Sequence, residues 1–178
     1  MASSPLPESH SSLAISLRPA RPEEAEFLYR VYASTRYEEL APTGWTSDQI
    51  EDFLRMQFRA QDTYYREHYA DAAFDVIVCN GQPAGRLYVY RDQKELRIID
   101  IALLPEFRRA GIGSKLLGQL LTEATVTGVP VGIYVEVFNP ALRLYERLGF
   151  VRIALTGVYY QMEWRPPGVL AAKSYHTG

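Results

Sequence analysis

The sequence predicts an α/β fold, with one mixed central sheet of about seven strands and helices on both faces. Three observations predict it. Apolar runs rich in β-branched residues recur along the chain, as expected of buried strands. Segments with apolar residues at helical spacing alternate with them. A chain of 178 residues with 47% hydrophobic residues is long enough to bury one core, so we expect a single domain.

Local signals mark where the expected elements begin and end. Thr46 and Gln49 form a capping box before the second helix. Asn80-Gly81 is a hairpin signal, and Pro83 weakens the start of the next strand or marks a bulge. Gly128 ends the third helix. The expected strands are 13–18, 74–79, 86–90, 96–104, 131–137, 151–156 and 158–164, and the expected helices are 23–39, 46–69, 114–127 and 140–148.

Composition and charge argue against several classes of protein. The net charge of -2 gives no reason to expect nucleic acid or an acidic membrane as a partner. Cys79 is the single cysteine, so no intrachain disulfide forms, and we expect it to be a small buried residue. No apolar run is long enough to span a membrane, and the N-terminus lacks the pattern of a secretory signal. We therefore expect a cytoplasmic protein that begins with a disordered tail over 1–12.

The chain is organised around a strand, a glycine-rich loop and a helix N-terminus. The strand over 96–104 ends at Pro105, which lacks a backbone donor, and the helix begins near Ser114. The first N–H groups of a helix have no intrahelical partner and carry the positive end of its dipole. Gly111 and Gly113 let a ligand approach this backbone closely. Such a loop is suited to holding a phosphate group.

Two motifs in this order resemble the signatures of the GNAT superfamily of N-acetyltransferases. Arg108, Gly111 and Gly113 form Arg-x-x-Gly-x-Gly, which is similar to the pyrophosphate loop of that family. Residues 139–150, Asn-Pro-Ala-Leu-Arg-Leu-Tyr-Glu-Arg-Leu-Gly-Phe, resemble its second signature, in the helix after the fifth strand. The resemblance covers residues 15 to 164 and is weakest before residue 74. It implies one acetyltransferase domain over 13–165, splayed between strands 4 and 5, with a loose tail over 166–178.

The resemblance also implies acetyl-CoA as the cosubstrate and assigns the residues that hold it. The backbone around Ile101, Ala102 and Leu103 would bind the pantetheine and the thioester carbonyl, and the N–H of Leu103 would stabilise the oxyanion. Asn139 would contact the pantetheine or cap the next helix. The pyrophosphate would lie on the backbone of the loop, with added charge from an arginine side chain, so the expected loop residues are Arg108, Arg109, Ala110, Gly111, Ile112, Gly113 and Ser114.

Tyr145 matches the family tyrosine that protonates the departing thiolate, and we assign it that catalytic role. The general base is less obvious. In several family members a Glu or His on the fourth strand deprotonates the amine, but the matching positions here are Arg97 and Ile99, and neither is a base. The period of two of a strand predicts that Asp100 faces the other side, unless a bulge rotates it.

Glu136 on the fifth strand is the better candidate for the base. Tyr134 and Glu136 share one face of this strand, while the two valines beside them suit a core. Glu136 would therefore face the cleft between the splayed strands. Glu38 and Glu39, at the end of the first helix, are rival candidates.

These residues predict an acetyl-CoA-dependent N-acetyltransferase. The amine of a small molecule or peptide would attack the thioester directly, through a tetrahedral intermediate. The alternative is a binding module that keeps the fold and binds acyl-CoA as a sensor, with little catalysis. A dinucleotide-binding enzyme is disfavoured because the full Gly-x-Gly-x-x-Gly pattern is absent. The spacing of His and Cys predicts no metal site. We expect no nucleic acid or membrane partner, and a homodimer is left open.

Overall fold

Seven strands and four α-helices make up residues 13–168, the part of the chain that the computed structural model describes. The expected tails over 1–12 and 169–178 lie outside these residues. The strands are β1 (Ile15–Pro19), β2 (Ala73–Cys79), β3 (Gln82–Arg91), β4 (Leu96–Leu103), β5 (Val131–Glu136), β6 (Val151–Thr156) and β7 (Tyr159–Trp164). The α-helices are α1 (Ala25–Leu40), α2 (Ser47–His68), α3 (Ile112–Thr127) and α4 (Leu142–Arg147), and the 3₁₀ helices are η1 (Pro22–Glu24), η2 (Ala41–Thr43) and η3 (Pro105–Phe107).

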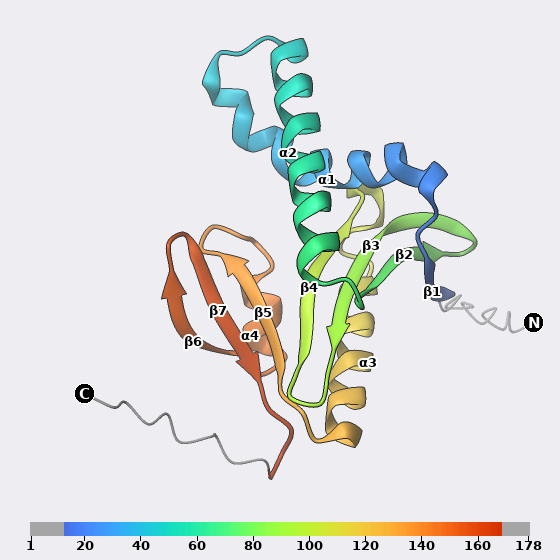
Figure 1. Cartoon of the computed structure of the whole chain (residues 1–178), viewed down its shortest axis with the longest axis vertical. Coiled ribbons are helices and arrows are strands. Elements are labelled where there is room, and N and C mark those ends of the chain that lie inside the picture. Colours follow the sequence, from blue (N-terminus) through green and yellow to red (C-terminus); the bar gives the residue numbers. More distant parts are fainter. Residues whose placement is uncertain (1–12, 169–178) are drawn as a thin grey trace, which may run out of the picture.

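The strands form one sheet in the order β1-β2-β3-β4-β5-β7-β6 (Figure 1). Every neighbouring pair is antiparallel except β4 and β5, which are parallel. The parallel pair needs a crossover, and α3 supplies it. The predicted mixed α/β sheet of about seven strands is confirmed.

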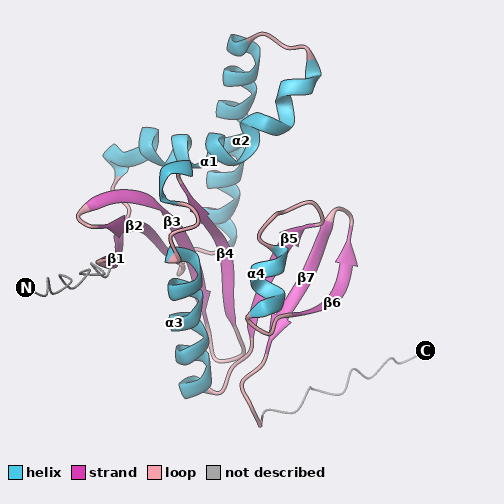
Figure 2. Cartoon of the chain, turned by 180° about the vertical axis from the view of Figure 1, so that it is seen from behind, coloured by secondary structure: helices cyan, strands magenta, loops and turns pink. Residues whose placement is uncertain are grey.

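Helices cover both faces of the sheet, as predicted. In Figure 2 α3 and α4 lie in front of the sheet, whereas in Figure 1, seen from the other side, α2 does. The main core lies on the α3 side and includes Ile77, Leu87, Ile98, Leu116, Leu120 and Ile133. A smaller cluster joins α1 to α2 and contains Tyr29, Tyr32, Ile50 and Leu54. Each such side chain contributes about 1.5–3 kcal/mol when fully buried, so the α3 side holds most of the stability.

The local turn signals are confirmed in detail. The Thr46 hydroxyl accepts the N–H of Gln49 at 3.3 Å, and the Gln49 side chain accepts the N–H of Thr46 at 2.9 Å. Asn80 and Gly81 have φ values of 49° and 80°, which the tight hairpin between β2 and β3 requires. Gly128, with φ of 72°, ends α3.

Some expected boundaries differ from the structure. β3 begins at Gln82, before the expected start at Arg86, because the hairpin carries its ladder through Pro83. The pairing slips between Ile77 and Val78 beside that proline, which is the bulge that the sequence left open. The fourth helix is α4 (Leu142–Arg147), shorter than the expected 140–148.

A second bulge lies in β4 and decides which side chains face the cleft. Tyr88 of β3 pairs with Asp100, but Val89 pairs with Ile98, so Ile99 is an extra residue in β4. Ile98 and Ile101 therefore both pack on the α3 side although they are three residues apart. Asp100 is turned to the opposite face, toward α2, where its carboxylate meets Arg86. The simple period of two is wrong here, since the bulge shifts it by one residue.

Candidate active site

The parallel strands β4 and β5 pair at one end and then separate. The ladder contains three pairs, Leu96 with Val131, Arg97 with Gly132 and Ile98 with Ile133. Beyond them β4 continues to Leu103 and β5 to Glu136 without pairing to each other, and the two strands diverge in Figure 1. The splay predicted between the fourth and fifth strands is therefore present. It exposes two backbone edges to a ligand that can enter between them.

The unpaired edge of β4 offers hydrogen-bonding groups to this opening. The N–H of Leu104 donates to the carbonyl of Ala84 in β3 at 2.9 Å. Because successive N–H groups of a strand point to opposite edges, the N–H groups of Leu103 and Ile101 point away from β3, toward the opening. Ala102 pairs with Arg86 of β3, so its own backbone groups point to β3. Of the three expected pantetheine-binding residues, Ile101 and Leu103 have their backbone groups on the open edge.

The glycine-rich loop presents a row of free backbone donors at the N-terminus of α3. The first helical bond that leaves this loop runs from the N–H of Lys115 to the carbonyl of Gly111, at 3.0 Å. Within residues 13–168, no acceptor meets the N–H groups of the six residues before Lys115, and no side chain caps the helix. Arg109 and Gly111 adopt φ values of 61° and 80°, which turn the chain into a concave loop. The donors belong to Arg109, Ala110, Gly111, Ile112, Gly113 and Ser114.

The side chain of Arg108 has a different position from the one expected for a phosphate ligand. Its Nε donates to the carbonyl of Leu103 at 2.8 Å, and its terminal nitrogen donates to the Ser34 hydroxyl at 2.9 Å. Arg108 thus ties the end of β4 to α1. Arg109 is exposed and is the loop arginine whose charge can face a phosphate.

Tyr145 on α4 is buried, with 4% of its surface exposed. Its ring packs edge-on against Phe150 with a centroid distance of 5.7 Å. In the described residues its hydroxyl has no hydrogen-bond partner, so it can serve an incoming ligand. Burial, and then the negative charge of Asp100, raise the pKa of Tyr145 above its usual value near 10. The hydroxyl is therefore protonated at neutral pH and acts as a donor.

Asn139 caps the turn that leads into α4. Its side-chain oxygen accepts the N–H of Ala141 at 2.8 Å, and its carbonyl accepts the N–H of Leu142 at 3.1 Å. The cap is one of the two roles that the sequence left open for this residue.

Glu136 lies at the end of β5 on the face predicted for it, while Val135 is buried in the α3-side core. Both oxygens of Glu136 are engaged. Two nitrogens of Arg36 on α1 approach them at 2.7 and 2.8 Å, and the Tyr159 hydroxyl donates at 3.2 Å. Burial disfavours the charge of Arg36, but Glu136 outweighs that effect and raises the pKa of the guanidinium. Glu39 contacts the same arginine at 3.2 Å from an exposed position.

Sequence reasoning missed the partners of these carboxylates. Arg36 and Glu136 are 100 residues apart in the chain, so no local pattern links them. Tyr159 is opposite Glu136 in the β5–β7 register, which an alignment of the two strands could have indicated. Arg86 pairs with Asp100. It is a charged residue between apolar residues of its strand, and this position could have indicated that it has a buried partner of opposite charge.

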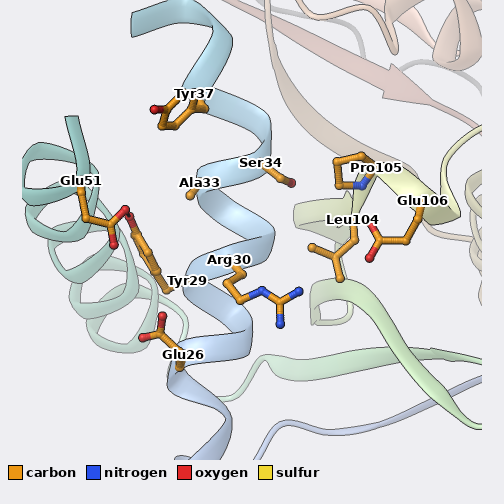
Figure 3. Close-up of a pocket in the computed structure, with 10 residues that line it drawn as sticks. All are labelled: Glu26, Tyr29, Arg30, Ala33, Ser34, Tyr37, Glu51, Leu104, Pro105 and Glu106. Atoms are coloured by element: carbon orange, nitrogen blue, oxygen red, sulfur yellow. Dashed lines mark hydrogen bonds between the residues drawn. The ribbon is translucent and has the colours of Figure 1, made fainter. Parts of the chain in front are cut away.

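A pocket of about 410 Å³ lies beside this region, between α1, α2 and the turn after β4 (Figure 3). Its charged lining residues are Glu26, Arg30, Glu51 and Glu106. Ser34, which also contacts Arg108, faces it from α1. The predicted site residues do not line this pocket, so we do not assign the acetyl-transfer chemistry to it.

Residues 13–168 contain no group of three or more His, Cys, Asp or Glu side chains arranged to hold a metal ion. None of the helices in this range is long and apolar enough to cross a membrane.

The family profile and the relatives that match this sequence are all acetyltransferases. The profile of the acetyltransferase (GNAT) family matches residues 29–150. An N-alpha-acetyltransferase of Sulfurisphaera tokodaii is 29% identical over 132 residues, covering 64% of this chain and 79% of that enzyme. N-alpha-acetyltransferase 50 of Danio rerio is 28% identical over 123 residues, covering 67% of each chain. A ribosomal protein bS18-alanine N-acetyltransferase of Haemophilus influenzae is 31% identical over 86 residues, covering 47% of this chain and 58% of that enzyme.

Solved structures share the fold. The PaiA N-acetyltransferase of Thermoplasma acidophilum, crystallised with coenzyme A, superposes with a TM-score of 0.64 at 18% identity, covering 85% of this chain and 99% of that one. Arabidopsis thaliana Naa50, in complex with a bisubstrate analogue, superposes with a TM-score of 0.56 at 18% identity, covering 84% and 97%. At these identities the likeness establishes the fold alone.

Proposed function

This chain belongs to the acetyltransferase (GNAT) family and is an N-acetyltransferase, and from that premise we propose that its domain over residues 13–165 transfers the acetyl group of acetyl-CoA to the α-amine of a peptide or protein N-terminus. The family uses acetyl-CoA as its donor.

The observation that carries the proposal is the row of six free N–H groups from Arg109 to Ser114. A row of backbone donors at a helix N-terminus, where the positive end of the helix dipole lies, favours an anionic group such as a pyrophosphate. In the chain, these six residues come shortly after the open edge of β4, which ends at Leu103. A pyrophosphate on the loop would therefore direct the pantetheine along Ile101 and Leu103, toward the splay between β4 and β5.

The N–H of Leu103 is the proposed oxyanion donor. When the amine attacks the thioester, negative charge develops on the carbonyl oxygen. A donor fixed in a strand needs no reorganisation to meet that charge, and such a group contributes about 2.7–4 kcal/mol to transition-state stabilisation. Arg108 supports the arrangement, because its bond to the carbonyl of Leu103 holds the end of β4 in place.

Tyr145 is the proposed acid for the leaving thiolate. A thiol has a pKa of about 8.5, below that of a tyrosine, so complete proton transfer from the buried phenol is uphill. Its hydroxyl is nevertheless protonated and free of other partners, and it can donate a hydrogen bond to the sulfur as the C–S bond breaks. That interaction is made only as charge develops, so it lowers the barrier.

Glu136 is the proposed base for the acceptor ammonium. It faces the opening between the strands, and Arg36 and Tyr159 fix the direction of its carboxylate. To accept a proton it must release one of these hydrogen bonds. The acceptor ammonium, which is itself a cation and a donor, can replace the bond that is lost.

The acceptor class rests on the relatives. Two are named N-alpha-acetyltransferases and a third a ribosomal protein alanine N-acetyltransferase. These names concern enzymes that share at most 31% identity with this chain. We therefore propose a peptide α-amine first and a small-molecule amine second.

The test is a panel of tetrapeptide amides with free α-amines, beside lysine side-chain and small-molecule amines, incubated with acetyl-CoA. Release of free CoA with acetylation of an α-amine in the mass spectrum is the expected result. Binding of acetyl-CoA in calorimetry without transfer to any amine would favour the acyl-CoA sensor instead.

A further inference from the structure

We infer that Asp100 binds the ammonium group of the acceptor at the mouth of the splay, as a second carboxylate beside Glu136. This inference rests on the proposed function and extends it to a residue on the opposite strand. The bulge at Ile99 is the first reason, because it turns Asp100 to the same face of the sheet as Glu136. Asp100 also stands in the part of β4 that has already separated from β5.

The surroundings of Asp100 form a buried polar cluster under α1 and α2. One nitrogen of Arg86 donates both to Asp100 and to the side-chain oxygen of Gln61 on α2 at 2.9 Å. The guanidinium lies 5.8 Å from the ring centre of Tyr32 and 5.9 Å from that of Phe58. The cluster therefore lies on the face of the sheet that α1 and α2 cover, away from the α3 core.

The carboxylate is the more accessible member of this pair. The side chain of Arg86 is 3% exposed, whereas that of Asp100 is 16% exposed. An approaching group can therefore reach the anion more readily than the cation. One oxygen of Asp100 accepts from Arg86, and the other has no hydrogen bond within residues 13–168.

Two further polar atoms of the cluster lack partners. In the described chain, Nε of Arg86 and the hydroxyl of Tyr88 are buried and make no hydrogen bond. Leaving a buried polar group without a hydrogen bond is unfavourable, so two of them beside one free carboxylate oxygen indicate a place for a polar ligand group. A donor-rich ammonium satisfies the carboxylate and can order water against the rest.

Asp100 and Glu136 then lie on the two strands that diverge, each backed by an arginine from another element. The charge of Asp100 also acts on the hydroxyl of Tyr145. An ammonium held by Asp100 would therefore lie on the same face of the sheet as the proposed base, between the two strands that diverge. Since the amine binds as a cation, Glu136 removes a proton from a group that Asp100 has already positioned.

The test measures the contribution of the ammonium itself. The wild type is saturated with CoA, and the affinity of the fastest-reacting tetrapeptide amide of the panel is compared with that of its desamino analogue. We expect the amine to bind at least about tenfold tighter, the value of one charge-assisted hydrogen bond. Asp100→Asn should bring this ratio close to one, without altering the affinity for acetyl-CoA. A purely structural role would weaken both peptides equally.

Matched variants keep the test decisive. Asp75→Asn removes a carboxylate from β2, at a position opposite Leu87 of the α3 core. This variant should bind the amine more tightly than the desamino analogue by the same factor as the wild type. Removing Asp100 alone leaves Arg86 as an uncompensated buried charge, so the double variant Arg86→Gln/Asp100→Asn provides a neutral pair that can fold. In this double variant the amine and its desamino analogue should also bind with nearly equal affinity.

Retention of the full ratio in both Asp100 variants would overturn the inference while the proposed function stands. The same holds if the ratio depends on Glu136 alone. Failure of the wild type to acetylate any amine would overturn the proposed function, and the inference with it.

Discussion

Arg36 of α1 and Glu136 of β5 form a two-point ion pair, with N–O distances of 2.7 and 2.8 Å, that joins this helix to the strand on the far side of the splay. Both side chains are only partly exposed, at 27% and 23%. The pair therefore fixes the direction of the carboxylate that we propose as the general base.

Glu136→Gln should lower turnover by about 10²- to 10⁴-fold, the usual contribution of a general base. The amide keeps the shape and one hydrogen-bond acceptor, so acetyl-CoA affinity should be unchanged in calorimetry. Glu39→Gln is the matched control, because Glu39 contacts the same arginine from the surface. Equal turnover of the two variants would remove Glu136 from the mechanism.

Tyr145→Phe should lower turnover by about 10- to 100-fold, which corresponds to one hydrogen bond to a charged group worth about 1.5–3 kcal/mol. The pKa of Tyr145 is raised above 10, so its hydroxyl stays protonated as pH rises to 9. The variant should therefore lose the same factor at every pH from about 6 to 9. If the variant instead abolishes a fall in activity below pH 9, Tyr145 titrates in that range and this assignment is wrong.

Gly111→Glu should abolish the stabilisation by acetyl-CoA. The residue has φ of 80°, and the new carboxylate would stand among donors that we assign to a pyrophosphate. At 100 times its dissociation constant, a ligand stabilises a protein by about 2.7 kcal/mol, which a thermal shift detects. Gly128→Glu is the control, because it imposes similar backbone strain at the other end of α3. A normal acetyl-CoA shift in Gly111→Glu would refute the loop assignment.

The ion pair between Arg18 and Glu24 should make stability depend on acidic pH. Its hydrogen bond, at 2.6 Å, lowers the pKa of Glu24 from 4.5 to about 2. The folded state thus favours the carboxylate, and the gain is complete above pH 4.5 and lost as pH falls toward 2.

Because the pair is partly exposed, we expect Glu24→Gln to cost less than about 1 kcal/mol at pH 7 and nothing near pH 2. Urea unfolding at both pH values measures the difference. Glu23→Gln, at an exposed neighbouring position, should behave as wild type at both. A cost of Glu24→Gln that persists at pH 2 would assign its effect to packing.

Local chemistry made much of the fold predictable. The capping box of Thr46 and Gln49, the hairpin at Asn80-Gly81 and the end of α3 at Gly128 each depend on a few adjacent residues. The alternation of apolar strands and amphipathic helices gave the elements their order. The bulge at Ile99 could not be predicted in the same way, because it is a mismatch between β4 and the register of β3.

The residues of the candidate site also differ in how far the sequence alone could predict them. The loop from Arg108 to Gly113 and the position of Tyr145 were visible as contiguous motifs, and their roles remain predictions. The pairs Arg36–Glu136 and Arg86–Asp100 join residues far apart in the chain, and only the folded sheet brings them together. The motif left open which arginine adds charge to the loop, and only the fold distinguishes them, because the guanidinium of Arg108 reaches back to Leu103 and Ser34.

The most direct test of the central claim is mass spectrometry of a tetrapeptide amide panel after incubation with the protein and acetyl-CoA, with free CoA measured in parallel. We expect acetylation of the α-amine, stoichiometric release of CoA, and loss of both signals in Gly111→Glu but not in Gly128→Glu. Acetylated peptide formed equally by Gly111→Glu, or no transfer to any amine by a wild type that binds acetyl-CoA, would contradict it.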